Sequence, residues 1–233
     1  MKKLDINETK EFYERAENVW SNSSWYKYSY SFIYNYIHCS ALTKCQYIFN
    51  AGSAGNTYDL NCRMHHMDIA KNKIEKCDEY TIGSIESIPL ENNTFDGVIC
   101  VGSVINYTDA IISISELIRI ADKNGIIVLE FENSNSFEYL FKKVYKSDAT
   151  IIDTEYLGNS QKQWIYSYEY ITSVIRSFKN IEIVDITGFH ILDSLFAKQE
   201  SIAKFFNKYE ESLNKNAFMK KHAGNIILTL KKL

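Results

Sequence analysis

Apolar residues along this chain occur in two patterns, compact runs and helical stripes. The compact runs are bounded by Gly, Asn, Asp or Ser, as the buried strands of a parallel sheet commonly are. They predict strands at residues 47–49, 64–67, 79–82, 95–101 and 125–131. Alternating apolar residues at 181–186 and 226–230 predict two further strands that form a hairpin-like pair near the end of the sequence.

The helical stripes, in which apolar residues recur every three or four positions, lie between and around these runs. The clearest covers residues 110–121, and Lys123-Asn124-Gly125 is a good sequence for ending it. Further helices are predicted at residues 5–20, 25–42, 71–76, 137–145, 168–178 and 194–213, and a short strand at 164–166. Strands that alternate with helices predict an α/β fold, an open sheet with helices on both faces.

The helix predicted at residues 25–42 has two interpretations. Its stripe of aromatic and aliphatic residues can pack on the sheet, or its tyrosines can overhang a ligand as a lid. We expect mostly packing, with a few aromatic side chains reaching the ligand. The candidates are Tyr13, Trp20, Trp25 and Tyr26.

One turn organises the rest of the chain. The run 47–49 stops at Asn50-Ala51-Gly52-Ser53-Ala54-Gly55, whose small residues let a ligand lie against the backbone. Asp68 ends the next strand, where a carboxylate can hold ribose hydroxyls. Only residues 56–60 remain for a connecting helix, about one turn. This arrangement predicts a nucleoside site without the helix N-terminus that a pyrophosphate needs.

Composition and charge narrow the classes of partner. The 233 residues suffice for one domain with a real core, and the net charge of −3 provides no basic surface for a nucleic-acid backbone. Aromatic residues reach 14%, which fits either an aromatic-lined pocket or a coding bias toward Tyr, Asn, Ile and Lys. No apolar run is long enough to span a bilayer.

Five scattered cysteines do not form a disulfide framework, and the charged N-terminus lacks the apolar segment of a signal peptide. We therefore expect a soluble cytoplasmic protein. Cys62-x-x-His65-His66 could suggest a metal, but these residues lie in and beside a strand and no second ligand pair is suitably spaced. We expect no metal.

Five segments in a fixed order resemble the class I S-adenosylmethionine (SAM) dependent methyltransferases. They are Asn50-Ala51-Gly52-Ser53-Ala54-Gly55, Asp68, residues 83–89, residues 93–99 and residues 116–125. The likeness is greatest to their small-molecule, type 11 branch and covers residues 44–135. It implies a Rossmann-like three-layer sandwich, with a mostly parallel seven-stranded sheet whose last strand is antiparallel. Within one domain, residues 1–43 would form a helical cap, 44–135 the SAM-binding core, and 136–233 the substrate-side helices and terminal strands.

The resemblance also implies where SAM lies. The Gly52 turn would contact its amino-acid part, Asp68 its ribose, Ile69 one face of the adenine, and Ser84 and Ile85 the adenine edge. The residues after the fourth strand would border the methionine part and the methyl group. The implied cofactor-binding set is Asn50, Ala51, Gly52, Ser53, Asp68, Ile69, Ser84, Ile85, Val101, Gly102 and Ser103.

Three departures from the family's pattern bear on that site. Asn50 stands where the family usually has an acid. Ala54 or Asn56 stands where the family has a further glycine, and Ser84 stands where it commonly has an aspartate. Asp68 is intact, so we expect SAM to bind. SAM has no pyrophosphate, so the shortened connection after the turn removes little that it needs, whereas NAD would lose its anion site.

Methyl transfer from SAM is an in-line displacement that depends mainly on positioning. A base is needed only for an acceptor that arrives protonated, and the candidates for catalysis are Tyr107, Glu132 and His190. Glu132 could instead be a solvated strand-end carboxylate, and His190 a histidine of a surface turn. Substrate-binding candidates, whose aromatic walls suit a flat or cationic acceptor, are Tyr13, Trp25, Tyr26, Asn106, Trp164 and Tyr166.

The predicted function is transfer of a methyl group from SAM to an oxygen or nitrogen atom of a small metabolite, by a monomer or homodimer. Two alternatives remain open at this point. One is an inactive SAM-binding subunit that acts with a partner chain, and the other is an NAD-dependent oxidoreductase. A nucleic-acid or membrane partner is not expected.

Overall fold

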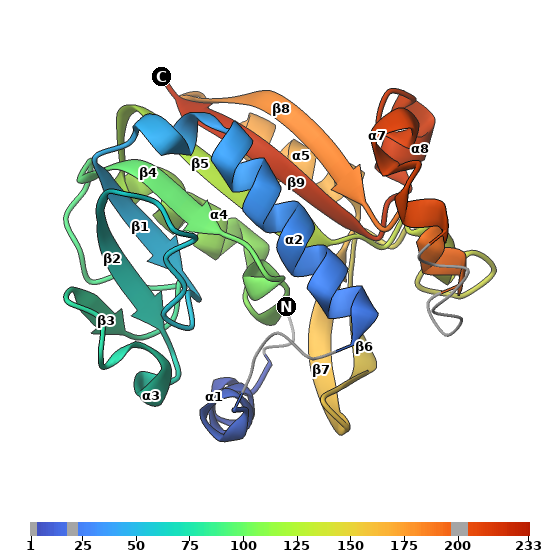
Figure 1. The fold of residues 1–233 in the computed structure, drawn as a ribbon, viewed down its shortest axis with the longest axis horizontal. Coiled ribbons are helices and arrows are strands. Elements are labelled where there is room, and N and C mark those ends of the chain that lie inside the picture. Colours follow the sequence, from blue (N-terminus) through green and yellow to red (C-terminus); the bar gives the residue numbers. More distant parts are fainter. Residues whose placement is uncertain (1–3, 18–22, 197–204) are drawn as a thin grey trace.

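A seven-stranded sheet forms the centre of the protein in the computed structural model, which describes residues 4–17, 23–196 and 205–233. Its strand order is β3-β2-β1-β4-β5-β9-β8 (Figure 1). All pairs are parallel except those made by β9, which runs antiparallel to both of its neighbours, β5 and β8. The strands are β1 (Tyr47–Ala51), β2 (Arg63–Asp68), β3 (Tyr80–Ile82), β4 (Phe95–Cys100), β5 (Ala121–Glu132), β8 (Ile181–Phe189) and β9 (Asn225–Lys232). The predicted sheet, with its last strand antiparallel, is confirmed.

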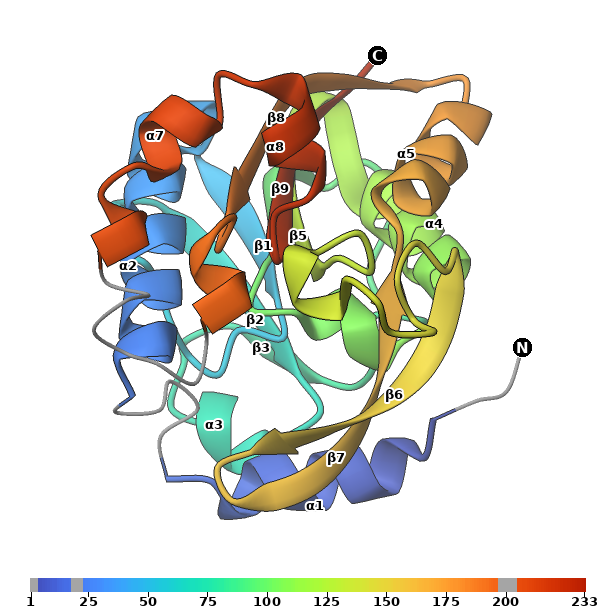
Figure 2. The same ribbon diagram turned by 90° about the vertical axis from the view of Figure 1, so that its right-hand side faces the viewer.

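Helices cover the two faces of this sheet and make three layers (Figure 2). The helix α2 (Ser24–Cys39) crosses one face and buries Ile33 and Ile37 against it. The helices α4 (Ala110–Ile120) and α5 (Tyr168–Ser177) cover the other face. Successive strand residues point to opposite faces, so Val128 of β5 packs beneath α2 while Leu129 packs beneath α4 and α5.

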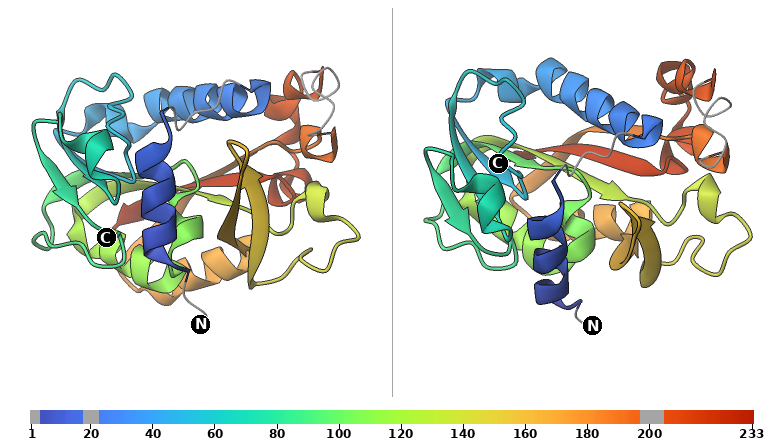
Figure 3. Two further views of the ribbon diagram at one scale, coloured as in Figure 1. Left: turned by 90° about the horizontal axis from the view of Figure 1, so that it is seen from below. Right: turned by 60° about the horizontal axis from the view of Figure 1, so that its bottom comes forward.

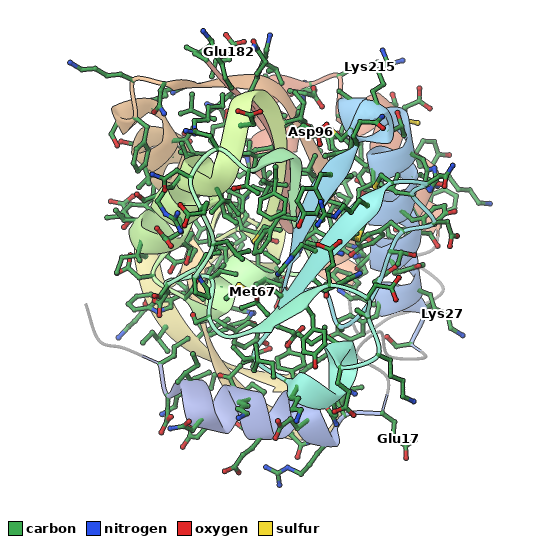
Figure 4. All side chains as sticks on the ribbon, turned by 90° about the vertical axis from the view of Figure 1, so that its left-hand side faces the viewer. Glu17, Lys27, Met67, Asp96, Glu182 and Lys215 are labelled. Carbon is green, nitrogen blue, oxygen red and sulfur yellow. The ribbon has the colours of Figure 1, made fainter. Side chains whose placement is uncertain are left out.

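The helix α1 (Ile6–Arg15) lies across the carboxyl ends of the parallel strands, beside a two-stranded hairpin of β6 (Ala149–Tyr156) and β7 (Asn159–Tyr166) (Figures 2 and 3). Figure 4 shows α1 beyond the end of the sheet near which Met67 lies, whereas Asp96 lies toward the opposite end. The N-terminal helices and the hairpin therefore enclose one edge of the sheet.

The connection from β1 to β2 contains no helix. Five of its residues have positive φ: Gly52, Ala54, Gly55, Tyr58 and Asp59. A right-handed helix of L-residues cannot contain such backbone. The predicted shortening of the connecting helix is therefore confirmed, and it goes further than predicted because no helical turn remains. On the far side of β2 only a short helix follows, α3 (Lys71–Ile74).

Several predicted helices are shorter than expected. The first ends at Arg15 because the N–H of Ala16 caps it on the Phe12 carbonyl, and residues 18–20, with Trp20, lie outside the described residues. The helix predicted at 137–145 is wrong, since a 3-10 turn (Phe137–Tyr139) is followed by further turns.

The helix predicted at 194–213 is also wrong as one continuous element. A 3-10 turn (Asp193–Phe196) precedes residues 197–204, which lie outside the described residues. A turn at 208–209 then separates the helical residues 205–207 from α7 (Glu210–Leu213), which is followed by α8 (Ala217–Lys221). Within the part of the chain that the structure describes, no helix is both long and apolar enough to cross a membrane.

Candidate functional site

A cavity of about 430 Å³ lies at the carboxyl ends of β1, β2, β4 and β5. This edge of an α/β sheet is where ligands usually bind. Loops that follow the strands form one end of the cavity, which we call the cofactor end. Its lining residues are Gly52, Ser53, Ala54, Tyr58, Asp68, Ile69, Gly83, Ser84, Ile85, Val101, Gly102, Ser103 and Glu130.

The other end is formed by α1, α2, the β6–β7 hairpin and the 3-10 turns, and we call it the tyrosine chamber. Side chains with hydroxyl, amide or carboxyl groups predominate there. It is lined by Thr9, Tyr13, Trp25, Tyr26, Tyr107, Thr108, Glu132, Ser136, Glu138, Tyr139, Thr154, Glu155, Tyr156 and Gln163.

Asp68 is held at the cofactor end by the two turns that flank it. Its Oδ2 accepts a hydrogen bond from the N–H of Ala54 at 2.9 Å, and its Oδ1 accepts one from the N–H of Ala70 at 2.9 Å. Burial raises the pKa of this carboxyl, and the backbone hydrogen bonds oppose that rise. Each oxygen keeps a lone pair for a further donor, so the carboxylate can accept two more hydrogen bonds.

Gly52 brings the backbone of the β1 turn close to the loop after β4. Its φ is +57°, and a Cβ added there would lie 2.3 Å from Cγ2 of Val104. Both the conformation and the contact therefore require glycine. Ser103 on the facing loop is also left-handed, with φ of +60°. The two loops are thus packed together at this point, and both line the cavity.

Glu130 closes the cofactor end from β5. The carboxylate is fully buried, and it accepts hydrogen bonds from the N–H of Ser103 and from Nδ2 of Asn225, both at 2.6 Å. Burial raises its pKa, and these hydrogen bonds oppose the rise. This residue is not among the candidates from the sequence, although it is two positions before Glu132.

Glu132 lies where the two ends of the cavity meet. Its Oε2 accepts a hydrogen bond of 2.5 Å from Nε2 of Gln163, on β7. Burial, with the nearby carboxyls of Glu130 and Glu138, raises its pKa to about 7. A carboxyl with such a pKa can accept a proton near neutral pH.

Tyrosine hydroxyls surround Glu132 in the chamber. Tyr13 and Tyr107 are hydrogen-bonded to each other, and their rings meet edge to face with centroids 5.8 Å apart. Burial raises the pKa of Tyr107 well above its ordinary value, and the charge of Glu132 adds to the rise. Tyr107 therefore stays protonated and donates hydrogen bonds; it is a poor base.

His190 does not line the cavity and is fully buried behind α2. Its Nε2 is 2.8 Å from the hydroxyl oxygen of Ser29, and its Nδ1 is 2.5 Å from Oδ2 of Asp193. The indole of Trp25 stacks on the imidazole, with centroids 3.5 Å apart. The alternatives from the sequence, a ligand-contacting base or a histidine of a surface turn, are both corrected. Ser29 and Trp25 separate His190 from the cavity that they line.

Five other predicted site residues also lie outside the lining. Asn50 donates a hydrogen bond to the Asn56 carbonyl and organises the turn, and Ala51 is buried in the core. Asn106 joins backbone groups of Trp164 and Glu132, and the hydroxyl of Tyr166 donates to the Thr108 carbonyl. Trp164 is itself buried. These aromatic and amide side chains support the residues that line the cavity and do not line it themselves.

The cavity contains the remaining predictions. Nine of the cofactor-binding candidates line it, as do Tyr107, Glu132, Tyr13, Trp25 and Tyr26. Sequence reasoning missed Tyr58, in the connection after β1, and Glu130, although Glu130 lies in a strand that the sequence predicts. It also missed Tyr139, Tyr156 and Gln163, which come from segments whose position depends on the tertiary fold. Among the described residues, no group of three or more His, Cys, Asp or Glu side chains is arranged to hold a metal ion.

The sequence profile of the methyltransferase domain matches residues 41–129. A sequence search of curated proteins gave no match. Many solved structures share the fold.

Three of these structures illustrate the similarity. The PH0226 protein of Pyrococcus horikoshii OT3 is 13% identical in sequence to this chain, with a TM-score of 0.63 over 96% of this chain and 98% of that one. A SAM-dependent methyltransferase of Archaeoglobus fulgidus is 13% identical, with a TM-score of 0.53 over 87% and 94%. The 1,6-didemethyltoxoflavin-N1-methyltransferase of Burkholderia thailandensis, with S-adenosylhomocysteine (SAH) bound, is 9% identical, with a TM-score of 0.59 over 97% and 86%. Residues 41–129 therefore match a methyltransferase domain, and the seven-stranded sheet to which they belong has the fold that SAM-dependent methyltransferases among these structures share.

Proposed function

We propose that this protein transfers the methyl group of SAM to an oxygen or nitrogen atom of a small molecule bound in the tyrosine chamber. The observation that carries the proposal is the continuity of the two ends of one cavity, with Glu132 at their junction. The cofactor end is suited to a nucleoside and an amino acid. The chamber beside it has room and polar groups for a second molecule.

The residues present fit SAM. Asp68 would bind the ribose hydroxyls, Ile69 and Ile85 would pack against the adenine, and the backbone at Gly52 and Gly102 would lie along the methionine part. The connection after β1 lacks a helix, so it provides no N-terminus for the pyrophosphate of NAD. These features favour SAM over a dinucleotide, and no observation favours an inactive subunit.

When bound, SAM supplies an activated methyl group on a sulfonium. The protein's own contribution is to hold the acceptor in line with that group and to exclude water. Tyr107, which accepts the hydrogen bond of Tyr13, can orient the acceptor by donating its own hydroxyl proton. Glu132, ionised above its raised pKa, can take the proton of a hydroxyl group as it attacks, or deprotonate an ammonium group so that the resulting amine can attack.

The proposal is tested first by calorimetric titration of the purified protein with SAH, with NAD as the comparison. Binding of SAH and not of NAD is expected. Transfer is then tested by incubating the protein with methyl-tritiated SAM and a panel of small phenols, carboxylic acids and amines, and measuring labelled product. A folded protein that binds no SAH would overturn the proposal, and so would SAH binding with no transfer to any acceptor of these classes.

A further inference from the structure

The ammonium group of SAM needs a negatively charged or strongly accepting partner, and the residue expected from the family's pattern is absent. Asn50 stands in its place, is uncharged, and has its amide turned away from the cavity onto the Asn56 carbonyl. We propose that Glu130, at the carboxyl end of β5, binds the ammonium group of the methionine part of SAM. The inference rests on the proposed function and identifies the residue that completes its cofactor site.

Strand register places Glu130 beside the methionine end of the site. Ala51 of β1 pairs with Cys100 of β4, and Cys100 pairs with Leu129 of β5. Gly52 and Val101 directly follow β1 and β4, and they line the edge of the cavity with Glu130, the residue after Leu129 in β5. Glu130 lies two strand spacings from Gly52, about 10 Å, a span that the amino-acid part of SAM can bridge.

The side chain of Glu130 also points to the same face of the sheet as Asn50. Val128 packs beneath α2, and side chains two residues apart in a strand share a face. Asn50 pairs with Ile99, and Ile99 with Val128, in the row behind. Glu130 therefore lies two residues beyond the row of Asn50, closer to the ligand and on the same face of the sheet. The charge missing from β1 is present on β5.

The surroundings of Glu130 leave its charge without a cation. It is 0% exposed, and it accepts hydrogen bonds from the backbone at Gly102 and Ser103, from the Ser103 side chain and from Asn225. Among the described residues that line the cavity there are five carboxyl groups and no lysine, arginine or histidine. A buried carboxylate that no cation neutralises costs free energy unless a ligand supplies the charge.

Two observations place Glu130 beside the ligand space. Glu130 lines the cavity together with Tyr58, and its charge is one of the causes that raise the pKa of that tyrosine. Glu130 also accepts a hydrogen bond from the N–H of Ser103. The family resemblance places Ser103 beside the methyl group of SAM.

The test compares three ligands by calorimetry on the wild-type protein and on Glu130→Gln. SAH carries the ammonium group, deaminated SAH lacks only that group, and 5′-methylthioadenosine lacks the whole amino-acid part. We expect Glu130→Gln to weaken SAH binding about 10- to 100-fold, the range for a lost hydrogen bond between charged groups. Binding of the other two ligands should stay within twofold of wild type.

Glu138→Gln is the matched control, because Glu138 also lines the cavity but at the tyrosine chamber. It should leave all three affinities unchanged. Glu130→Asp, which keeps the charge on a shorter side chain, should lose less SAH affinity than Glu130→Gln and covers the case in which the glutamine variant does not fold.

Equal weakening of all three ligands by Glu130→Gln would show that Glu130 is only a structural brace, and unchanged SAH binding would show that another group binds the ammonium. Either result overturns the inference and leaves the proposed function intact. A wild-type protein that binds neither SAH nor 5′-methylthioadenosine would instead contradict the proposed function itself.

Discussion

The two ends of the cavity are built in different ways. At the cofactor end the ligand meets backbone turns that directly follow strands of the sheet, and Asp68 is fixed by the N–H groups of its own neighbours. In the tyrosine chamber the groups come from α1, α2, a 3-10 turn and a hairpin, and they are fixed by contacts with one another. One end is set locally, the other only by the assembled fold.

This difference implies a division of labour. A locally fixed site can keep the same cofactor while the chamber changes its acceptor, since helices and hairpins can vary without disturbing the strand ends. The predictions below change one end at a time. Each asks whether the other end is unaffected, beginning with the largest expected effect.

Glu132→Gln should lower the rate of methyl transfer by about 100-fold or more, the usual contribution of a general base. In the wild-type protein the rate should rise with pH through a midpoint near 7 and level off above it, because the carboxyl must be ionised to accept a proton and its pKa is raised to about 7. The glutamine variant should lose that pH dependence. The measurement is the pH–rate profile with methyl-tritiated SAM and an acceptor found in the panel.

Stability gives an independent readout of the same carboxyl. Its folded pKa exceeds its ordinary value of 4.5, so the folded protein binds the proton more tightly than the unfolded chain. The stabilisation is full below about 4.5 and is lost as the pH rises toward about 7. Denaturant unfolding of Glu132→Gln should show a smaller fall across this range, and an identical fall in both proteins would contradict the assigned pKa.

Asp68→Ala should weaken SAH binding about 100-fold, because the ribose hydroxyls lose two hydrogen bonds to a charged group. Asp68→Asn is the matched variant, which keeps one acceptor oxygen and should lose less. Calorimetry with SAH measures both. If Asp68→Ala bound SAH as well as the wild type does, the cofactor would not lie where the strand-end turns place it.

The outcome of the sequence predictions follows the same division. Gly52, Asp68 and Ser103 could be located from the sequence because each adjoins a strand whose apolar run is plain. Tyr156 and Gln163 could not, since the β6–β7 hairpin carries no strong apolar pattern and its register over the cavity depends on α1. His190 was misassigned for the same reason, because its burial depends on α2, more than 150 residues earlier in the chain.

Gly52→Ala should destabilise the protein by about 1–3 kcal/mol and weaken SAH binding several-fold. The alanine is strained at a φ of +57°, and its Cβ meets Val104. The double variant Gly52→Ala, Val104→Ala removes the overlap but not the strain, so it should recover part of the loss. Thermal unfolding and calorimetry provide the two measurements, and a fully restored double variant would assign the whole effect to the contact.

The smallest effect is expected in the chamber, from the hydrogen bond between Tyr13 and Tyr107. A double-mutant cycle with Tyr13→Phe and Tyr107→Phe should give a coupling energy of about 0.5–1.5 kcal/mol in the free energy of unfolding. All three variants should bind SAH within twofold of wild type, because neither hydroxyl belongs to the cofactor end. A coupling near zero would show that the two hydroxyls are not held by each other. A loss of SAH affinity would show that the chamber and the cofactor end are not independent, since α1 would then hold both.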